Sequence, residues 1–156
     1  MQNTNPSDLL GFLIQDVARL MSRTFEQQHG DLPITRSQAR LLAYISLNEG
    51  AKQSEIAALM DVQKITLTKM TNDLETKSLV ERRTDPTDRR VRKLYMTEDA
   101  KPVLEGIWLR LLDVSTIALS AVPKNRRKQF LDDLMRVRMH LLQTTLLTTQ
   151  QETRVK

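Results

Sequence analysis

The segment Leu79-Val-Glu-Arg-Arg-Thr-Asp-Pro-Thr-Asp-Arg-Arg-Val-Arg-Lys-Leu-Tyr-Met-Thr97 has turn-forming residues in its centre and strand-forming residues on both sides. Residues 79–83 and 91–97 predict two short strands, because their side chains follow a period near two. The turn residues are Asp85-Pro86-Thr87-Asp88, where proline fixes φ and aspartate accepts hydrogen bonds from nearby backbone N–H groups. The sequence therefore predicts a β-hairpin with its tip near these residues.

The excess positive charge of the chain is concentrated in this hairpin. Residues 82–93 contain six Lys or Arg and two Asp, a net charge of +4, whereas the whole chain of 156 residues has +5. A cluster of this density repels itself unless a polyanion or local carboxylates offset it. A solvated surface loop and a nucleic-acid site are the two interpretations, and the residues before the hairpin distinguish them.

Two short helices are predicted directly before the hairpin. Residues 53–60 and 64–76 each carry apolar side chains at helical spacing, and only residues 61–63 separate them. This pattern matches a helix-turn-helix, whose second helix enters the major groove of DNA, although αα-hairpins of other all-helical proteins share it. A charged hairpin that follows such a pair has the layout of a winged helix. The two signals together favour DNA binding over a solvated loop.

Two further helices are predicted upstream. Ser7 is suited to cap a first helix that reaches about residue 28. Thr35 and Gln38 have the spacing of a capping box, which predicts a second helix over residues 36–47.

The C-terminal third predicts two long helices, one capped by Thr97 and one that follows Pro123. Each would span roughly 35 Å at about 1.5 Å per residue. Helices this long, with a wide apolar arc, extend beyond so small a domain. We expect them to pair with the same helices of a second chain, and an αα-hairpin folded on its own domain is the alternative. The remaining segment, residues 148–156, is expected to be a flexible tail.

Composition excludes several classes of protein. The chain has no cysteine and only two histidines, far apart, so we expect no disulfide scaffold, metal site or cofactor. No apolar run approaches the roughly 20 residues of a membrane span, and the N-terminus lacks the basic region of a secretory signal. We therefore expect a cytoplasmic protein that does not bind membranes. Without a glycine-rich phosphate loop or a nucleophile–base set, the sequence also argues against an enzyme.

The layout resembles the multiple antibiotic resistance regulator (MarR) family of bacterial transcription factors, from about Leu9 to Leu142. The most specific likeness runs from Asp88-Arg-Arg90 through Val-Arg-Lys-Leu-Tyr-Met-Thr-Glu98, and is similar to the wing signature of the family. The segment 74–82 resembles the transition from recognition helix to wing. Ser78 stands where the family often has glycine.

The resemblance implies a mostly helical fold with a small β-hairpin wing: a winged helix-turn-helix with N- and C-terminal dimerisation helices. Residues 35–97 would form the DNA-binding lobe, and residues 1–34 with 98–147 the helical dimerisation lobe. The expected function is that of a homodimeric regulator, in most members a repressor, on a palindromic operator in double-stranded DNA. Many members release DNA when a small phenolic or other lipophilic effector binds.

The resemblance and the helix pattern together single out candidate DNA contacts. Arg90 at the wing tip is suited to a narrow minor groove, and Asp88 to holding the loop backbone and Arg90 in place. Asp88 as a plain turn residue is the alternative. On the recognition helix the candidates lie off the apolar stripe, near the end that faces base edges. The candidates are Gln63, Lys64, Thr66, Thr68 and Lys69 on the helix, Asp88, Arg89, Arg90 and Arg92 on the wing, and Arg36, Ser37 and Lys93 as phosphate contacts.

One competing function remains at this point. A winged helix can serve as an adaptor that binds a protein partner and not DNA. The two functions differ in salt dependence, since several phosphate contacts make DNA binding weaken steeply as salt rises.

Overall fold

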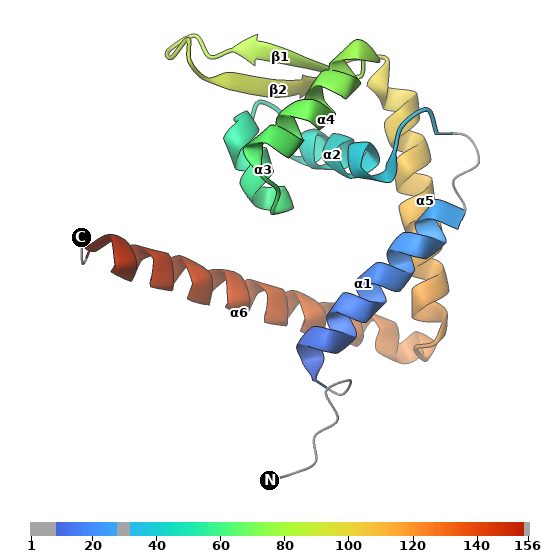
Figure 1. The fold of residues 1–156 in the computed structure, drawn as a ribbon. Helices are drawn as coiled ribbons and strands as arrows, with labels where there is room; N and C mark the ends of the chain where they lie inside the picture. The colour runs from blue at the N-terminus through green and yellow to red at the C-terminus, as the bar shows by residue number, and fades with distance from the viewer. Residues whose placement is uncertain (1–8, 28–31, 155–156) are drawn as a thin grey trace. The chain divides into compact units, whose positions relative to one another are not determined.

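The computed structural model describes residues 9–27 and 32–154, with side chains described as far as residue 144. The chain divides into two compact units, residues 1–114 and 115–156. Within the described residues the structure is helical apart from one two-stranded antiparallel sheet (Figure 1). None of these helices combines the length and apolarity that crossing a membrane requires. The predicted cap Ser7 lies outside the described residues.

The helices of the first unit begin and end close to the positions that the sequence predicts. They are α1 (Leu10–Gln27), α2 (Arg36–Leu47), α3 (Gln53–Met60) and α4 (Lys64–Thr76), followed by the first part of α5 (Ala100–Ser120). The predicted fold class, mostly helical with a hairpin wing, is confirmed.

The predicted capping box opens α2. The Thr35 hydroxyl accepts a hydrogen bond from the backbone N–H of Gln38 at 3.3 Å, and the Gln38 side chain accepts one from the Thr35 N–H at 3.0 Å. Both bonds satisfy N–H groups that a helix start leaves free. This fixes where α2 begins, and its apolar residues Leu41, Leu42 and Ile45 are fully buried.

Helices α2, α3 and α4 share one core. Ile56 of α3 and Leu67 and Leu74 of α4 have no exposed surface, and Leu94 of the hairpin joins them. The turn between α3 and α4 is made by Asp61, whose φ of 52° is left-handed and ends α3. The short turn and the shared core hold α4 against the domain by one face and leave its other face exposed.

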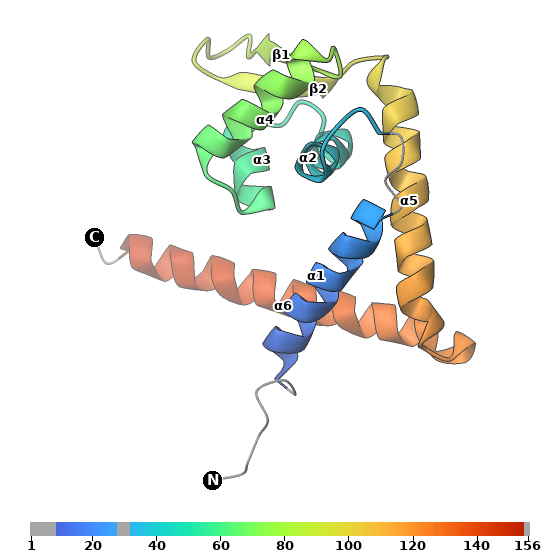
Figure 2. The same cartoon turned by 45° about the vertical axis from the view of Figure 1, so that its right-hand side comes forward.

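The hairpin consists of β1 (Val80–Thr84) and β2 (Arg92–Met96), paired from Val80–Met96 to Thr84–Arg92. It lies along α4, and its closed tip is on the side where α4 begins (Figures 1 and 2). Its outer edge is paired as well, because the Leu94 N–H donates to the Ala51 carbonyl at 3.0 Å. The wing is therefore attached both to α4 and to the segment that leads into α3.

The junction between the hairpin and α5 differs in one detail from the sequence prediction. Helix α5 begins at Ala100, and the Thr97 hydroxyl donates a hydrogen bond to the Ser78 carbonyl at 2.5 Å. Thr97 thus joins the two ends of the hairpin and does not cap the helix with its side chain. Pro102 falls in the first turn of α5, where its missing N–H is tolerated.

The second unit contains the end of α5, a 3-10 turn over Lys124–Arg126 and helix α6 (Arg127–Arg154). Helix α6 continues through residues 148–154, within the segment that the sequence assigns to a tail. Its apolar side chains are largely exposed in the single chain, including Phe130, Leu131 and Met135. In the first unit, α1 is similar: its large apolar residues from Leu10 to Leu20 are 42% to 57% exposed.

Candidate nucleic-acid interface

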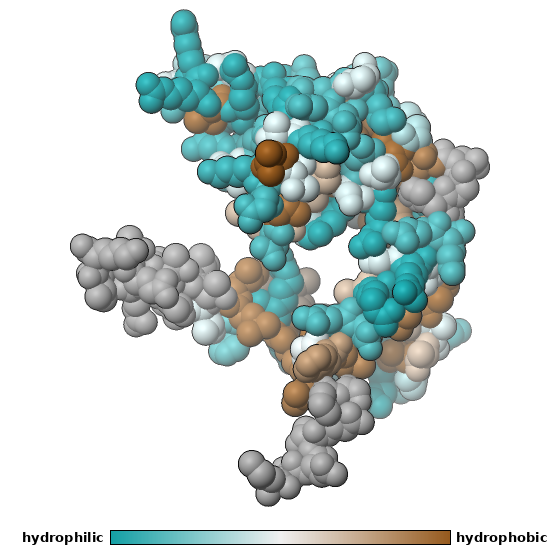
Figure 3. Space-filling view, viewed as in Figure 1, coloured by the Kyte–Doolittle hydropathy of each residue, from teal (hydrophilic) through white to brown (hydrophobic). Residues whose placement is uncertain are grey.

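The first half of α4 presents an exposed polar face. All five residues that the sequence selects on this helix are exposed, whereas Leu67 and Leu74 on the opposite face are completely buried. Hydrophilic side chains predominate on the visible surface of the hairpin and of α3 and α4 (Figure 3). The exposed residues are Gln63, Lys64, Thr66, Thr68 and Lys69.

The structure brings the start of α4 and the hairpin to one cationic cavity. The cavity has a volume of about 320 Å³ and is lined by residues from three places: the start of α3, the first turns of α4 and the wing. Four of its lining residues are basic and none is acidic. The lining residues are Lys52, Gln53, Ser54, Lys64, Thr68, Arg90, Val91 and Arg92. Residues distant in sequence thus form one surface with the electrostatic character that a phosphate backbone requires.

The wing tip is held by two aspartates. One Asp85 carboxylate oxygen accepts hydrogen bonds from the Thr87 N–H at 2.8 Å, the Thr87 hydroxyl at 2.5 Å and the Asp88 N–H at 3.2 Å. The Asp88 carboxylate accepts one from the backbone N–H of Arg90 at 2.9 Å. Asp88 therefore shapes the backbone that carries Arg90, while the Arg90 side chain stays exposed.

A charge pair supports the base of this loop. The Lys93 ammonium lies 2.8 Å from the second carboxylate oxygen of Asp85, which is the more buried of the two partners. This ammonium and the Thr87 donors hold the pKa of the Asp85 carboxyl well below its usual range, and the carboxylate in turn raises the pKa of Lys93. Lys93 is thus engaged within the loop and is less available as a phosphate contact than the sequence suggests.

The remaining candidates fall into two groups. Arg89 and Arg92 are exposed on the wing, and the Arg92 guanidinium also donates to the Thr84 hydroxyl across the strands. At the start of α2, Ser37 is exposed, and the Arg36 guanidinium pairs with Glu26 of α1 at 3.1 Å. Arg36 therefore links two helices in the free protein.

A family model matches the part of the chain that builds this surface. The model of the MarR family matches residues 34–91, which contain α2, α3, α4 and the hairpin as far as Val91. The match covers 58 of the 156 residues, so this part of the chain is similar to the MarR family. Members of this family are transcription regulators and not enzymes, which agrees with the expectation from the sequence.

Relatives and solved structures agree with this assignment. A protein of Thauera aromatica, "Putative transcriptional regulatory protein for hcr operon", is 39% identical over 89 residues, 57% of this chain and about half (52%) of that protein. A crystal structure of MarR superposes with a TM-score of 0.81 at 22% identity, over 92% of this chain and 97% of that one. At this identity the structural likeness establishes the fold.

Two other solved structures are of regulators with a DNA or a small-molecule partner. The repressor CouR, bound to a 23-mer DNA duplex, has a TM-score of 0.73 at 21% identity, over 88% of this chain and 97% of that one. BpsR of Bordetella bronchiseptica, described with regulation of its DNA binding by 6-hydroxynicotinic acid, has a TM-score of 0.72 at 16% identity, over 86% of this chain and 96% of that one.

Sequence reasoning missed the residue that fastens this MarR-type wing to its recognition helix. The Arg82 guanidinium forms an ion pair with Glu75, donates to Asn72 Oδ1 at 2.7 Å and donates to Gln53 Oε1 at 3.2 Å. Gln53 in turn donates to the Thr68 hydroxyl at 2.7 Å. One cation thus connects β1, α4 and α3. Its partners lie 7 to 29 residues earlier in the sequence, and no local pattern marks them.

Thr68 and Asp85 also have roles that differ from the expectation. The Thr68 hydroxyl donates to the Lys64 carbonyl at 2.9 Å and accepts from Gln53, so it already has internal partners. Asp85 organises the wing tip more extensively than Asp88 does. A sequence signal for it existed, because an aspartate two residues before a threonine is typical of a turn capped by its own side chain.

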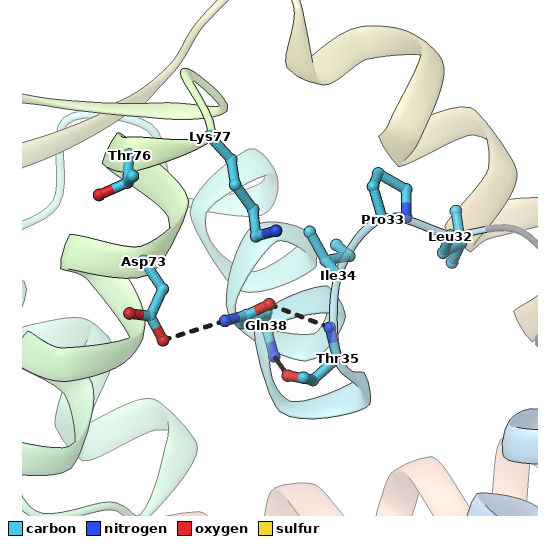
Figure 4. Close-up of a pocket in the computed structure, with 8 residues that line it drawn as sticks. All are labelled: Leu32, Pro33, Ile34, Thr35, Gln38, Asp73, Thr76 and Lys77. Atoms are coloured by element: carbon cyan, nitrogen blue, oxygen red, sulfur yellow. Dashed lines mark hydrogen bonds between the residues drawn. The ribbon is translucent and has the colours of Figure 1, made fainter.

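A second cavity lies behind the recognition helix. It has a volume of about 630 Å³, and its lining comes from the segment before α2, the first turn of α2 and the last turn of α4 (Figure 4). Gln38 donates to Asp73 at 3.1 Å across it. The lining combines apolar and charged groups: Leu32, Pro33, Ile34, Thr35, Gln38, Asp73, Thr76 and Lys77.

Proposed function

We propose that this protein is a homodimeric repressor of the MarR family that binds a palindromic operator in double-stranded DNA. Residues 35–97 form the DNA-binding lobe, and residues 1–34 and 98–147 supply the dimerisation helices. A two-fold dimer that places α4 of each protomer in the major groove needs half-sites about one helical turn, ~34 Å, apart. Such a protein acts where the chromosome lies, in the bacterial cytoplasm.

The observation that carries the proposal is the shared cationic surface of α4 and the wing. Lys64 at the start of α4 lines the same cavity as Arg90 and Arg92 of the hairpin. A helix in the major groove with a wing over the adjacent backbone would meet phosphates at this junction, since most protein–DNA hydrogen bonds go to phosphate and sugar. The CouR–DNA complex, which shares this fold, supports the same mode of binding.

Arg90 and its neighbours divide the work on the wing. We assign the Arg90 guanidinium to the minor groove, where a narrow groove concentrates negative potential. Asp85 and Asp88 act indirectly, because their carboxylates accept hydrogen bonds from the loop backbone and limit the directions in which Arg90 can point. Arg89 and Arg92 contact phosphates and contribute affinity more than sequence preference.

We further propose that a small aromatic effector controls DNA binding. The fold neighbour BpsR, whose DNA binding is described as regulated by 6-hydroxynicotinic acid, supports this class of compound. The cavity of Figure 4 is suited to it, because Leu32 and Ile34 offer apolar contact and Lys77 offers a cation to a carboxylate or phenolate. A ligand there would touch Asp73 and Thr76 of α4 and thereby shift the recognition helix. The corresponding measurement adds small aromatic acids to the protein–DNA complex and follows the release of bound duplex.

The decisive experiment selects bound fragments from random duplex DNA at two salt concentrations and then measures affinity by fluorescence anisotropy. We expect Arg90→Ala to weaken binding about tenfold or more, since losing a hydrogen-bonded cation costs about 1.5–3 kcal/mol and 1.4 kcal/mol is tenfold. Wild-type affinity should fall linearly with salt on a logarithmic scale, with a slope that counts the phosphate contacts.

Arg136→Ala is the matched control, because it removes the same charge from an exposed position on α6. This variant should bind like the wild type. A protein that enriches no duplex, or whose binding to a partner is indifferent to salt, would instead be an adaptor. Equal affinity of Arg90→Ala and wild type would show that the wing is not the minor-groove element.

A further inference from the structure

Ile65 is the most exposed large apolar side chain in the described part of the chain. It is 81% exposed, compared with 0% for Leu67 on the same helix. It is the second residue of α4, between Lys64 and Thr66, and therefore belongs to the turn that opens the recognition helix. Single exposed apolar residues are common on protein surfaces, so exposure alone carries no argument. The argument rests on the position of Ile65 in the first turn of the recognition helix.

Folding gives no reason for isoleucine at this position. Its side chain leaves most of its surface in water, so it contributes little burial, and Leu67 and Leu74 supply the core face of α4. A β-branched residue is also a poorer helix former than alanine, because its χ1 is restricted. Replacing Ile65 by alanine should therefore leave the stability of the free protein unchanged or slightly higher.

The surroundings of Ile65 select the kind of partner. Lys64, its neighbour in the chain, lines the cationic cavity together with Arg90 and Arg92, which is suited to a polyanion. The first residues of a recognition helix approach base edges in the major groove. Among the groups displayed there, the C5-methyl of thymine is the apolar one, and apolar side chains contact it.

We propose that Ile65 reads thymine, by contact with its C5-methyl group in each half-site of the operator. The proposal rests on the proposed function as a DNA-binding regulator. It adds an apolar specificity contact to the polar residues of α4, which the sequence pattern alone selects. Burial of one CH₂ group contributes about 0.8 kcal/mol. Removing one methyl group from a contact that excludes water should therefore change affinity about fourfold.

The test uses the full-length protein and the duplex selected from random DNA. Each thymine of a half-site is replaced in turn by deoxyuridine, which lacks only the methyl group, and affinity is measured by anisotropy for wild type and Ile65→Ala. At one thymine position, wild-type affinity should fall about fourfold per half-site, whereas Ile65→Ala should bind both duplexes equally. Leu47→Ala is the matched control, because Leu47 is also a highly exposed aliphatic residue (70%) but lies at the end of α2.

Thermal unfolding of the free variants separates recognition from folding, and Ile65→Ala should melt no lower than the wild type. If every deoxyuridine substitution affects wild type and Ile65→Ala alike, the contact does not exist and the inference is overturned while DNA binding stands. If Ile65→Ala loses affinity only for a protein partner, Ile65 belongs to a protein interface. If no duplex is enriched, the proposed function and this inference fall together.

Discussion

Ser78 occupies the left-handed backbone region at the turn from α4 into β1, with a φ of 56°. Its N–H donates to the Glu75 carbonyl at 2.9 Å, and its own carbonyl accepts the Thr97 hydroxyl. The turn is thus bonded on both sides and fixes the backbone in a conformation that costs an L-residue roughly 1–2 kcal/mol. The family often has glycine at this position, and the structure supplies the reason.

We predict that Ser78→Gly stabilises the protein by about 0.5–1 kcal/mol. Glycine removes the strain of positive φ but loses more conformational entropy on folding, so the gain is smaller than the strain itself. Urea denaturation at a fixed protein concentration measures the change. Ser78→Ala is the control and should stay near the wild type, because alanine keeps the Cβ atom. A Ser78→Gly variant less stable than the wild type would contradict the account of this turn.

At the scale of single elements, the hairpin tip depends on a charge. The Asp85 carboxylate faces the Lys93 ammonium and accepts three donors from Thr87 and Asp88. The lowered pKa of Asp85 means that the folded hairpin binds its proton more weakly than the unfolded chain does. The pairing therefore stabilises the fold at every pH above the ordinary aspartate pKa of about 3.9, and this stabilisation is lost as the pH falls through the folded pKa.

We predict that Asp85→Asn loosens the wing at pH 7 and that the difference from wild type shrinks below about pH 4. Asparagine keeps an acceptor for the Thr87 N–H but loses the charge that holds Lys93. Binding would then have to order the loop, which lowers operator affinity roughly threefold to tenfold. Hydrogen exchange at the Thr87 and Asp88 amides, measured from pH 7 to well below pH 4, follows the loop directly. Asp99→Asn, at an exposed carboxylate outside the hairpin, is the control and should change neither the amide protection nor the operator affinity. Equal protection in Asp85→Asn and wild type at pH 7 would refute the prediction.

The elements also show what a sequence can reveal. The start of α2 was predictable to the residue, because a capping box is a local pattern in which Thr35 and Gln38 satisfy each other. The α3–α4 pair and the hairpin were predictable for the same reason: short-range periodicity and turn chemistry encode them. The bonds from Arg82 to Asn72 and Gln53 were not predictable, because they exist only after three elements have come together. Local patterns place the candidate side chains, whereas tertiary packing decides which of them remain free for DNA.

At the scale of the whole molecule, the main feature that a single chain does not explain is its exposed apolar surface. Helix α1 exposes Phe12, Leu13 and Leu20 at 52% to 57%, and α6 exposes Met135 and Leu141 at 55% and 60%. Contiguous apolar faces of this kind mark interaction sites, in contrast to a single exposed residue such as Ile65. The sequence already predicted helices with an apolar arc too wide for one chain. Two copies that cover these faces satisfy both the burial and the two-fold symmetry that a palindromic operator needs.

We therefore predict that the protein sediments as a dimer, at twice the chain mass of 18.0 kDa, and that Leu13→Glu dissociates it. In a two-fold interface the substitution occurs twice and removes roughly 2 kcal/mol of leucine burial each time, so the dissociation constant should rise about a thousandfold. Sedimentation equilibrium measures this, and the melting temperature of the wild type should rise with protein concentration. Gln15→Glu adds the same charge at an exposed polar position of α1 and should leave the dimer intact. A wild type that remains monomeric at micromolar concentration would contradict the dimer. A dimeric Leu13→Glu variant would place the interface away from this face of α1. The two recognition helices would then have to reach successive major grooves by a different arrangement of the dimer.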